Sequence, residues 1–175
     1  MSAASILVPR PLTRDAFAPY GTVLDIADGV PETRLINQGA CVRHHALAAV
    51  EALGEGASVV VNLFRTEPIH RPFALRMMER HPLGSQAFWP LSGRKWLAAV
   101  APDVRGRPGR PEVFIIRADQ GVCYAPNVWH HPLMALDTVC DFLVVDRDGP
   151  GNNLEEASYD EPWTLALESL PASSP

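Results

Sequence analysis

Short hydrophobic runs, separated by prolines and glycines, make up most of this chain. The sequence holds 17 prolines and 12 glycines, which cut it into pieces typical of an all-β protein rather than of a helical bundle. Several pieces are rich in β-branched or aromatic residues, which suit a pleated, half-buried surface. We therefore predict strands at Ser58–Arg65, Ala74–Arg80, Gln86–Pro90, Lys95–Ala101, Glu112–Arg117, Val122–Tyr124, Leu133–Leu136 and Cys140–Asp146, with a further hairpin of Thr33–Ile36 and Cys41–His45.

One of these segments, Ala74–Arg80, fits a helix as well as a strand, because its residues are good helix formers. A proline stands on each side of it and its neighbours are strand-like, so we interpret it as a strand. The dipeptide Ser92-Gly93 predicts a hairpin turn between the strands on either side of it. Short helices are predicted at Thr13–Tyr20, Ala46–Leu53 and Glu161–Leu170.

The length of 175 residues suits one domain with its own core. We find no internal repeat and no interdomain linker, and we expect residues 1–175 to form a single domain. Residues Gly149–Asn153 are predicted to form a turn that leads to a peripheral tail at residues 154–175.

The formal net charge of −5 argues against nucleic acid or an anionic membrane as the main partner, because both favour basic surfaces. A small anionic ligand remains compatible with this charge, because it needs only one or two local arginines. No signal segment opens the chain and no apolar run approaches about 18 residues, so we expect a cytoplasmic protein. The three cysteines form no CxxC pair and are interpreted as reduced thiols.

Two polar clusters carry the candidate chemistry. Glu79 and His81 are two residues apart, so on a strand they point to the same face, and Gln86 follows a Pro-Leu-Gly-Ser turn that can bring it beside them. His130 and His131 lie some forty residues further along. On a continuous strand, alternation would direct only one of these two histidines inward; we favour His130 and leave the position of His131 open.

The spacing of these residues resembles the two sequence motifs of the cupins. Glu79, His81, Gln86 and Gly93 resemble the first motif, and the stretch from Gly121 to His130 resembles the second. The resemblance implies a cupin-like double-stranded β-helix, a jelly-roll barrel with a few short helices and its site in the barrel mouth. It also implies a divalent metal on His81, His130, Glu79 and Gln86.

The first motif departs from the usual cupin pattern at two ligand positions. Glu79 stands where histidine is usual, and Gln86 stands where glutamate is usual. We therefore expect a divalent ion to be held less tightly than by three histidines and a carboxylate.

A longer series of segments, in order along the chain, resembles the ureidoglycolate lyase family. The match extends from about Pro11 to Asn153 and is specific as a combination, although each piece alone is short. The matching segments are Phe17-Ala18-Pro19-Tyr20-Gly21, Asn37-x-Gly39, Arg43-His44-His45, Asn62-Leu63-Phe64-Arg65, Glu79 to Phe88, Asn127 to Leu133, and Asp141 to Arg147.

The resemblance implies an enzyme that cleaves (S)-ureidoglycolate to glyoxylate and urea in allantoin and purine breakdown. It further implies a cytosolic homodimer and a divalent metal, with nickel as the suggested ion, and we expect no organic cofactor. The proposed catalytic residues are His81, His130 and Glu79. The proposed substrate-binding residues are Arg43, Arg65, Asn62, Gln86, Tyr124 and His131.

The reaction itself needs a base for the hydroxyl proton, an acid for the departing urea nitrogen and a cation for the carboxylate. The chain offers histidines and carboxylates for proton transfer and arginines for a bidentate grip. It offers no evident Ser-His-Asp or activated cysteine arrangement. Two alternatives remain: an amidohydrolase releasing ammonia and carbon dioxide from the same substrate, and a non-catalytic cupin that binds a small acid.

Several candidates also have a purely structural interpretation. Arg43 and Arg65 fit exposed salt bridges as well as a substrate grip, and we expect at least one of them to line the pocket. Asp146 and Arg147 are predicted to close a strand with an ion pair. Asp141 fits either a carboxylate that orients a histidine or a solvated strand position.

Overall fold

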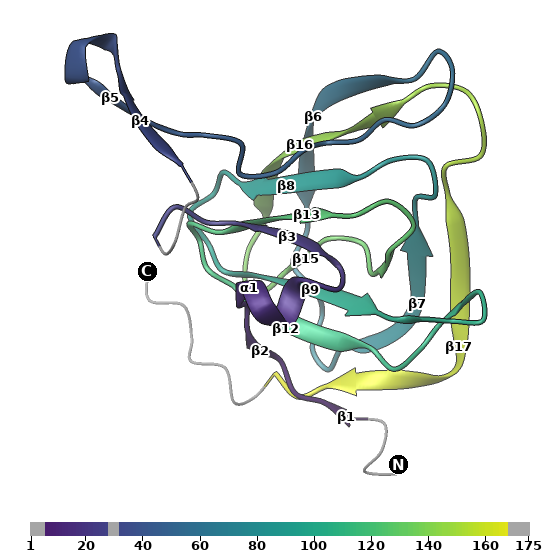
Figure 1. Cartoon of the computed structure of the whole chain (residues 1–175). Coiled ribbons are helices and arrows are strands. Elements are labelled where there is room, and N and C mark those ends of the chain that lie inside the picture. Colours follow the sequence, from purple (N-terminus) through teal and green to yellow (C-terminus); the bar gives the residue numbers. More distant parts are fainter. Residues whose placement is uncertain (1–5, 28–31, 168–175) are drawn as a thin grey trace.

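Two β-sheets face each other and enclose the space between them, as the computed structural model of the chain shows (Figure 1). The structure describes residues 6–27 and 32–167. The larger sheet has the order β1-β17-β7-β14-β9-β12-β2, with β15 paired to β9, and the smaller has the order β3-β13-β8-β16-β6. This curled arrangement confirms the all-β, cupin-like prediction.

The strands of the larger sheet are mostly short, apart from β17. Their bounds are β1 (Ile6–Leu7), β2 (Arg10–Pro11), β7 (Ala74–Arg80), β9 (Trp96–Ala101), β12 (Glu112–Ile116), β14 (Trp129–His130), β15 (Met134–Ala135) and β17 (Glu155–Leu165).

The smaller sheet contains the two longest strands after β17, which are β6 and β16. Its strands are β3 (Gly21–Leu24), β6 (Ser58–Thr66), β8 (Gln86–Pro90), β13 (Gly121–Tyr124) and β16 (Cys140–Asp148). Two separate hairpins are β4 (Thr33–Ile36) with β5 (Cys41–His44), and β10 (Asp103–Val104) with β11 (Arg107–Pro108).

Every strand predicted from the sequence has a counterpart within a few residues, including the ambiguous segment that becomes β7. The helix predicted near the start is present as α1 (Arg14–Phe17), which the hydroxyl of Thr13 caps by accepting a hydrogen bond from the Ala16 backbone. In the part of the chain that the structure describes, no helix is long and apolar enough to cross a membrane.

Two predicted helices are wrong within the described residues. Ala46–Leu53 is a loop whose apolar side chains pack on the outside of the smaller sheet, and the described part of Glu161–Leu170 includes the end of β17. Strand β17 pairs with β7 along most of its length, so contacts with a distant strand override its local helix propensity. Residues 155–165, expected in a peripheral tail, thus lie in the larger sheet.

The hairpin predicted at Ser92-Gly93 is also wrong. The turn connects β8 to β9, but these strands lie in different sheets and do not pair with each other. β8 pairs with β13 and β16, whereas β9 pairs with β12, β14 and β15. The chain therefore crosses from one sheet to the other at this turn. A local turn pattern does not predict which strands will pair on either side of it.

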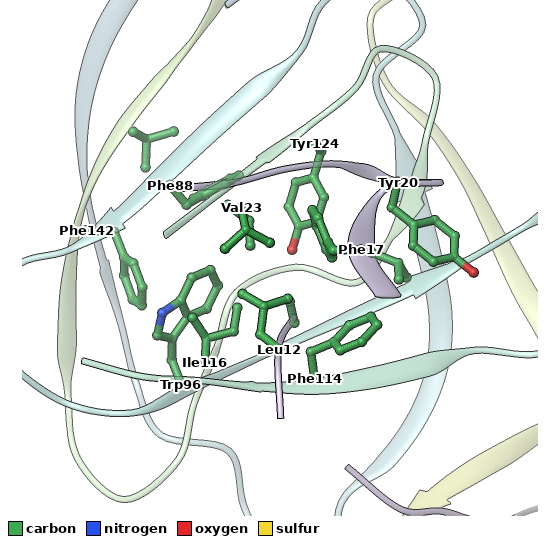
Figure 2. Packing of buried hydrophobic residues seen from close by; sticks show 14 of the residues in the cluster. Leu12, Phe17, Tyr20, Val23, Phe88, Trp96, Phe114, Ile116, Tyr124 and Phe142 are labelled. Atoms are coloured by element: carbon green, nitrogen blue, oxygen red, sulfur yellow. The ribbon is translucent and has the colours of Figure 1, made fainter. Parts of the chain in front are cut away.

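The main hydrophobic core fills part of the space between the two sheets (Figure 2). Phe17 from α1 packs edge-on against Phe114, and Trp96 packs in the same manner against Phe142. Phe88 and Tyr124 belong to this core and also line the pocket described below. The core thus forms one wall of the candidate site and fixes the strands that carry it.

Candidate active site

A pocket of about 570 Å³ opens between the two sheets. This volume is typical of small-molecule sites. The pocket brings together side chains from both sheets and from the segments that follow β14. Its lining residues are Phe64, Arg65, Thr66, Glu79, His81, Gln86, Phe88, Tyr124, His130, His131, Pro132, Leu133 and Leu154.

Strand pairing places the three central side chains. Glu79 on β7 lies directly opposite His130 on β14, and His81 follows just beyond the end of β7 on the face of Glu79. The Glu79 carboxylate oxygen Oε1 lies 3.6 Å from Nε2 of His130 and 3.8 Å from Nε2 of His81. The two imidazole rings are 5.3 Å apart between centroids.

Backbone carbonyls fix the orientation of both imidazoles. Nδ1 of His81 lies 2.6 Å from the carbonyl oxygen of Asn153, and Nδ1 of His130 lies 2.9 Å from that of Val128. Because a carbonyl only accepts, each Nδ1 carries the proton and each Nε2 of the neutral ring presents a lone pair. Both Nε2 atoms are buried and have no hydrogen-bond partner.

Burial and neighbouring charges shift the pKa values of Glu79, His81 and His130 in different directions. Burial acts to raise the pKa of Glu79, but the two nearby imidazoles outweigh it and hold that pKa below its ordinary value. Burial acts to lower the pKa of His81, but Glu79 and the Asn153 carbonyl raise it above its ordinary value. Burial dominates for His130 and lowers its pKa to about 4, which keeps this ring neutral near pH 7.

A second polar group adjoins the triad. Asp146 on β16 accepts a hydrogen bond of 2.9 Å from the amide of Asn62 and another from the side chain of Gln86. The amide nitrogen of Gln86 therefore points to Asp146, and its oxygen Oε1 is buried without a partner. Asn62 does not line the pocket itself but supports Asp146 from β6.

Tyr124 on β13 closes the deep side of the pocket. Its ring stacks on that of His130, with 4.3 Å between centroids and 12° between planes. Burial is the main cause that raises the pKa of the Tyr124 hydroxyl, and the charge of Glu79 adds to it. The hydroxyl therefore stays protonated near pH 7 and can only donate or accept hydrogen bonds there.

The donor set fits a divalent ion. Glu79, His81 and His130 each offer one ligand atom, and these atoms lie within 4.8 Å of one another. Two imidazoles and a carboxylate suit several first-row transition metals, and a hydrogen bond from each Nδ1 to a carbonyl is the usual support for a ligating histidine. Gln86 Oε1, also buried without a partner, is available as a fourth oxygen donor.

The two candidate arginines lie in different places. Arg65 lines the pocket mouth, but its guanidinium donates two hydrogen bonds, of 2.7 and 2.9 Å, to the carboxylate of Asp141. Asp141 is thus not a histidine partner but a solvent-exposed carboxylate on its strand, paired with Arg65. Arg43 lies on β5, away from the pocket lining of its own chain.

Both histidines of the second cluster line the pocket: His130, which strand alternation favours, and His131, which alternation left open. Strand β14 ends at His130, and alternation does not constrain His131 beyond that end. Nδ1 of His131 donates to the carbonyl of Pro132 at 2.9 Å. Burial lowers the pKa of His131, so this ring is also mostly neutral near pH 7.

The predicted ion pair of Asp146 and Arg147 is wrong as well. Neighbouring residues on β16 point to opposite faces, and Arg147 donates instead to the carbonyls of Leu53, Gly149 and Pro150. The alternation that buries Phe142 and Val144 could have placed Asp146 on the inner face. No comparable signal marks Asn153 or the apolar lining residues.

Comparisons with known proteins agree with the site. A family model described as ureidoglycolate lyase matches residues 4–166. The ureidoglycolate lyase of Rhizobium etli is 62% identical over 156 residues, which are 89% of this chain and 93% of the relative. That of Agrobacterium fabrum is 57% identical over 161 residues (92% and 96%), and that of Brucella ovis is 50% identical over 155 residues (89% and 90%).

Proposed function

The chain belongs to the ureidoglycolate lyase family, and from this premise we propose that its pocket cleaves (S)-ureidoglycolate to glyoxylate and urea. The observation that supports this most directly is the group of Glu79, His81 and His130, which is partly to fully buried and has two unpartnered imidazole nitrogens facing a pocket of suitable size. The substrate is a small molecule whose cleavage needs proton transfer at a hydroxyl and at a urea nitrogen.

Glu79 is suited to accept the hydroxyl proton. Its depressed pKa keeps the carboxylate ionised near pH 7, and Oε1 faces the two imidazoles. As that proton leaves, the hydroxyl oxygen becomes the carbonyl oxygen of glyoxylate and the C–N bond breaks. Removing the proton is therefore the step that releases both products.

His81 is suited to protonate the departing urea nitrogen. Its raised pKa increases the share of rings that hold a proton at Nε2, and the Asn153 carbonyl keeps Nε2 directed into the pocket. His130 has a pKa of about 4, so near pH 7 it serves as a neutral acceptor beside Glu79 rather than as an acid.

In place of these proton-transfer roles, the same three residues would hold a divalent ion, with Gln86 as a further oxygen donor. When bound, such an ion would supply Lewis acidity that polarises a substrate oxygen. Tyr124 and the buried rings around it would exclude water from the reacting atoms whether or not an ion is present.

The test is incubation of the purified protein with (S)-ureidoglycolate, with glyoxylate, urea and ammonia measured before and after chelation. Equal amounts of glyoxylate and urea support the lyase, whereas ammonia would show the amidohydrolase. Tight binding without turnover would show a non-catalytic protein. Loss of turnover on chelation, restored by one added metal, would show that an ion is required.

The substitution His81→Ala tests the assignment within the pocket. We expect turnover to fall by roughly a hundredfold or more, because proton transfer by a positioned side chain contributes about that much. The control is His70→Ala, since His70 is an exposed imidazole outside the pocket lining. Near-normal turnover of the His81 variant would show that His81 has a structural role and does not transfer a proton.

A further inference from the structure

The β4–β5 hairpin stands apart from the rest of the molecule. Its strands, Thr33–Ile36 and Cys41–His44, pair only with each other in the described part of the chain, and the hairpin projects away from both sheets (Figure 1). An isolated two-stranded hairpin is at best marginally stable in water. A surface outside this copy of the chain is therefore expected to support it.

The two faces of the hairpin differ in chemistry. On one face Leu35 lies opposite Val42, and these side chains are 72% and 53% exposed. On the other face Arg34 lies opposite Arg43, a like-charge pair that disfavours the isolated hairpin. Arg34 is paired with Glu32, whereas Arg43 has no ion-pair partner among the described residues.

Strand β6 offers a complementary edge. It is nine residues long and, within the described ranges, pairs only with β16, so its other edge is free. Val61 and Leu63 point outward and are 65% and 72% exposed. Asn62 and Phe64 point to the inner face, where Phe64 lines the pocket. A long, apolar edge strand of this kind favours pairing with another strand.

In the described part of the chain, no residue that lines the pocket offers an unpaired guanidinium or ammonium group. Arg65 is the lining arginine, and Asp141 already engages its guanidinium on two nitrogens. The nearby charges of Glu79 and Asp146 are negative, and the whole chain carries −5. If the substrate is the carboxylate of the proposed function, on which this step rests, a guanidinium from outside this copy would add to the positive charge that a protonated His81 or a bound ion supplies.

We propose that the β4–β5 hairpin of one copy of this chain adds to the free edge of β6 in a second copy and brings Arg43 to the mouth of that copy's pocket. Because side chains alternate along a strand, one pairing register satisfies both faces. Leu35 and Val42 extend the outer apolar row of Val61 and Leu63. Arg43 then lies on the inner face, toward the pocket.

A second copy fits better than another partner because the same chain carries both halves of the contact. A two-fold axis lets each copy give its hairpin and receive the other's, which forms two equivalent contacts in a closed dimer. Each pocket then gains one unpaired guanidinium, the group suited to a bidentate grip on a carboxylate. The dimer would thus complete the site as well as cover two exposed edges.

Sedimentation of the full chain tests the contact without reference to activity. We expect the unmodified protein to be a dimer. For Val42→Asp we expect the dimer dissociation constant to rise at least tenfold, because a charge replaces an apolar contact. The matched control is Val104→Asp, since Val104 is 55% exposed on the separate β10–β11 hairpin and should leave the dimer unchanged. A monomeric unmodified protein, or an unchanged Val42→Asp dimer, would overturn the proposal.

Mixed dimers test whether Arg43 acts across the contact. Arg43→Ala and His81→Ala are each expected to be poorly active, and a hybrid of the two, isolated with two different affinity tags, should recover about half of the unmodified activity. In the hybrid, the intact pocket of the Arg43 variant receives the intact hairpin of the His81 variant. No recovery would show that Arg43 does not serve the other copy's pocket.

The two measurements separate the possible failures. If the unmodified protein dimerises through the hairpin but turns over no ureidoglycolate, the proposed function fails and the contact stands. If the unmodified protein is active while the hybrid recovers nothing, the lyase stands and the shared site is refuted. A normal KM for Arg43→Ala in an intact dimer would likewise refute the carboxylate grip.

Discussion

Single residues decide which polar groups face the substrate. Glu79 and His81 share a face because they are two apart at the end of β7, and this follows from local geometry alone. Asp146 reaches the same region from β16 and fixes the amide of Gln86, so that the oxygen of Gln86 faces the pocket. Because Asp146 does not itself line the pocket, we expect it to position the amide of Gln86 rather than to contact substrate.

Replacing this carboxylate gives a test at the residue scale. In Asp146→Asn one carboxylate oxygen becomes an NH₂ group, so the side chain can no longer accept hydrogen bonds well from both Asn62 and Gln86. Gln86 therefore loses its fixed orientation. We expect kcat/KM, and the affinity of the metal-stripped protein for nickel measured by calorimetry, to fall about tenfold. Asp148→Asn, an exposed carboxylate on the same strand, serves as the control. Unchanged kinetics and nickel affinity would remove Asp146 from the site.

The elements around the pocket are joined by buried polar contacts as well as by strand pairing. Just after β3, Asp25 accepts hydrogen bonds from the Ala27 backbone, from Gln120 at 2.6 Å and from Arg117. Burial acts to raise the pKa of Asp25, but these donors and the arginine charge hold it below its ordinary value. The contacts tie β3 to the loop that precedes β13, which carries Tyr124.

The depressed pKa determines how this junction depends on pH. Because the folded state favours the ionised carboxylate, its contribution is fully present above about pH 4 and is lost as pH falls through the folded-state value. We expect Asp25→Asn to lower the free energy of unfolding by about 1–3 kcal/mol at pH 7. Urea unfolding at pH 7 and at about pH 3 should show that difference shrinking in acid. The exposed Asp160→Asn variant should show no such difference.

At the scale of the whole molecule, stability should depend on protein concentration. The β4–β5 hairpin and the free edge of β6 are covered only in the proposed dimer. Because higher protein concentration favours the dimer by mass action, it also raises the stability of the folded state. We expect calorimetry to give a higher midpoint temperature of unfolding at about 100 µM than at about 1 µM protein. Val42→Asp should reduce this dependence on protein concentration. A midpoint independent of concentration would contradict the expected homodimer.

The sequence by itself determined the positions of most strands and the main donors of the site. Proline and glycine spacing and apolar alternation are local signals, and they located β6, β7, β8 and β16 closely. The two-residue spacing of Glu79 and His81 and the motif around His130 likewise identified the groups that meet in the pocket.

Only the tertiary structure decided which segments pair and which charges are already engaged. β17 is a strand because β7 offers it a partner, and Ser92-Gly93 crosses between sheets because β8 and β9 find other neighbours. Asp141 engages Arg65, and Arg43 lies on a separate hairpin, because strand partners and side-chain contacts come from residues far apart in the chain. Local patterns specify the face on which a side chain lies, but not the group that it meets there.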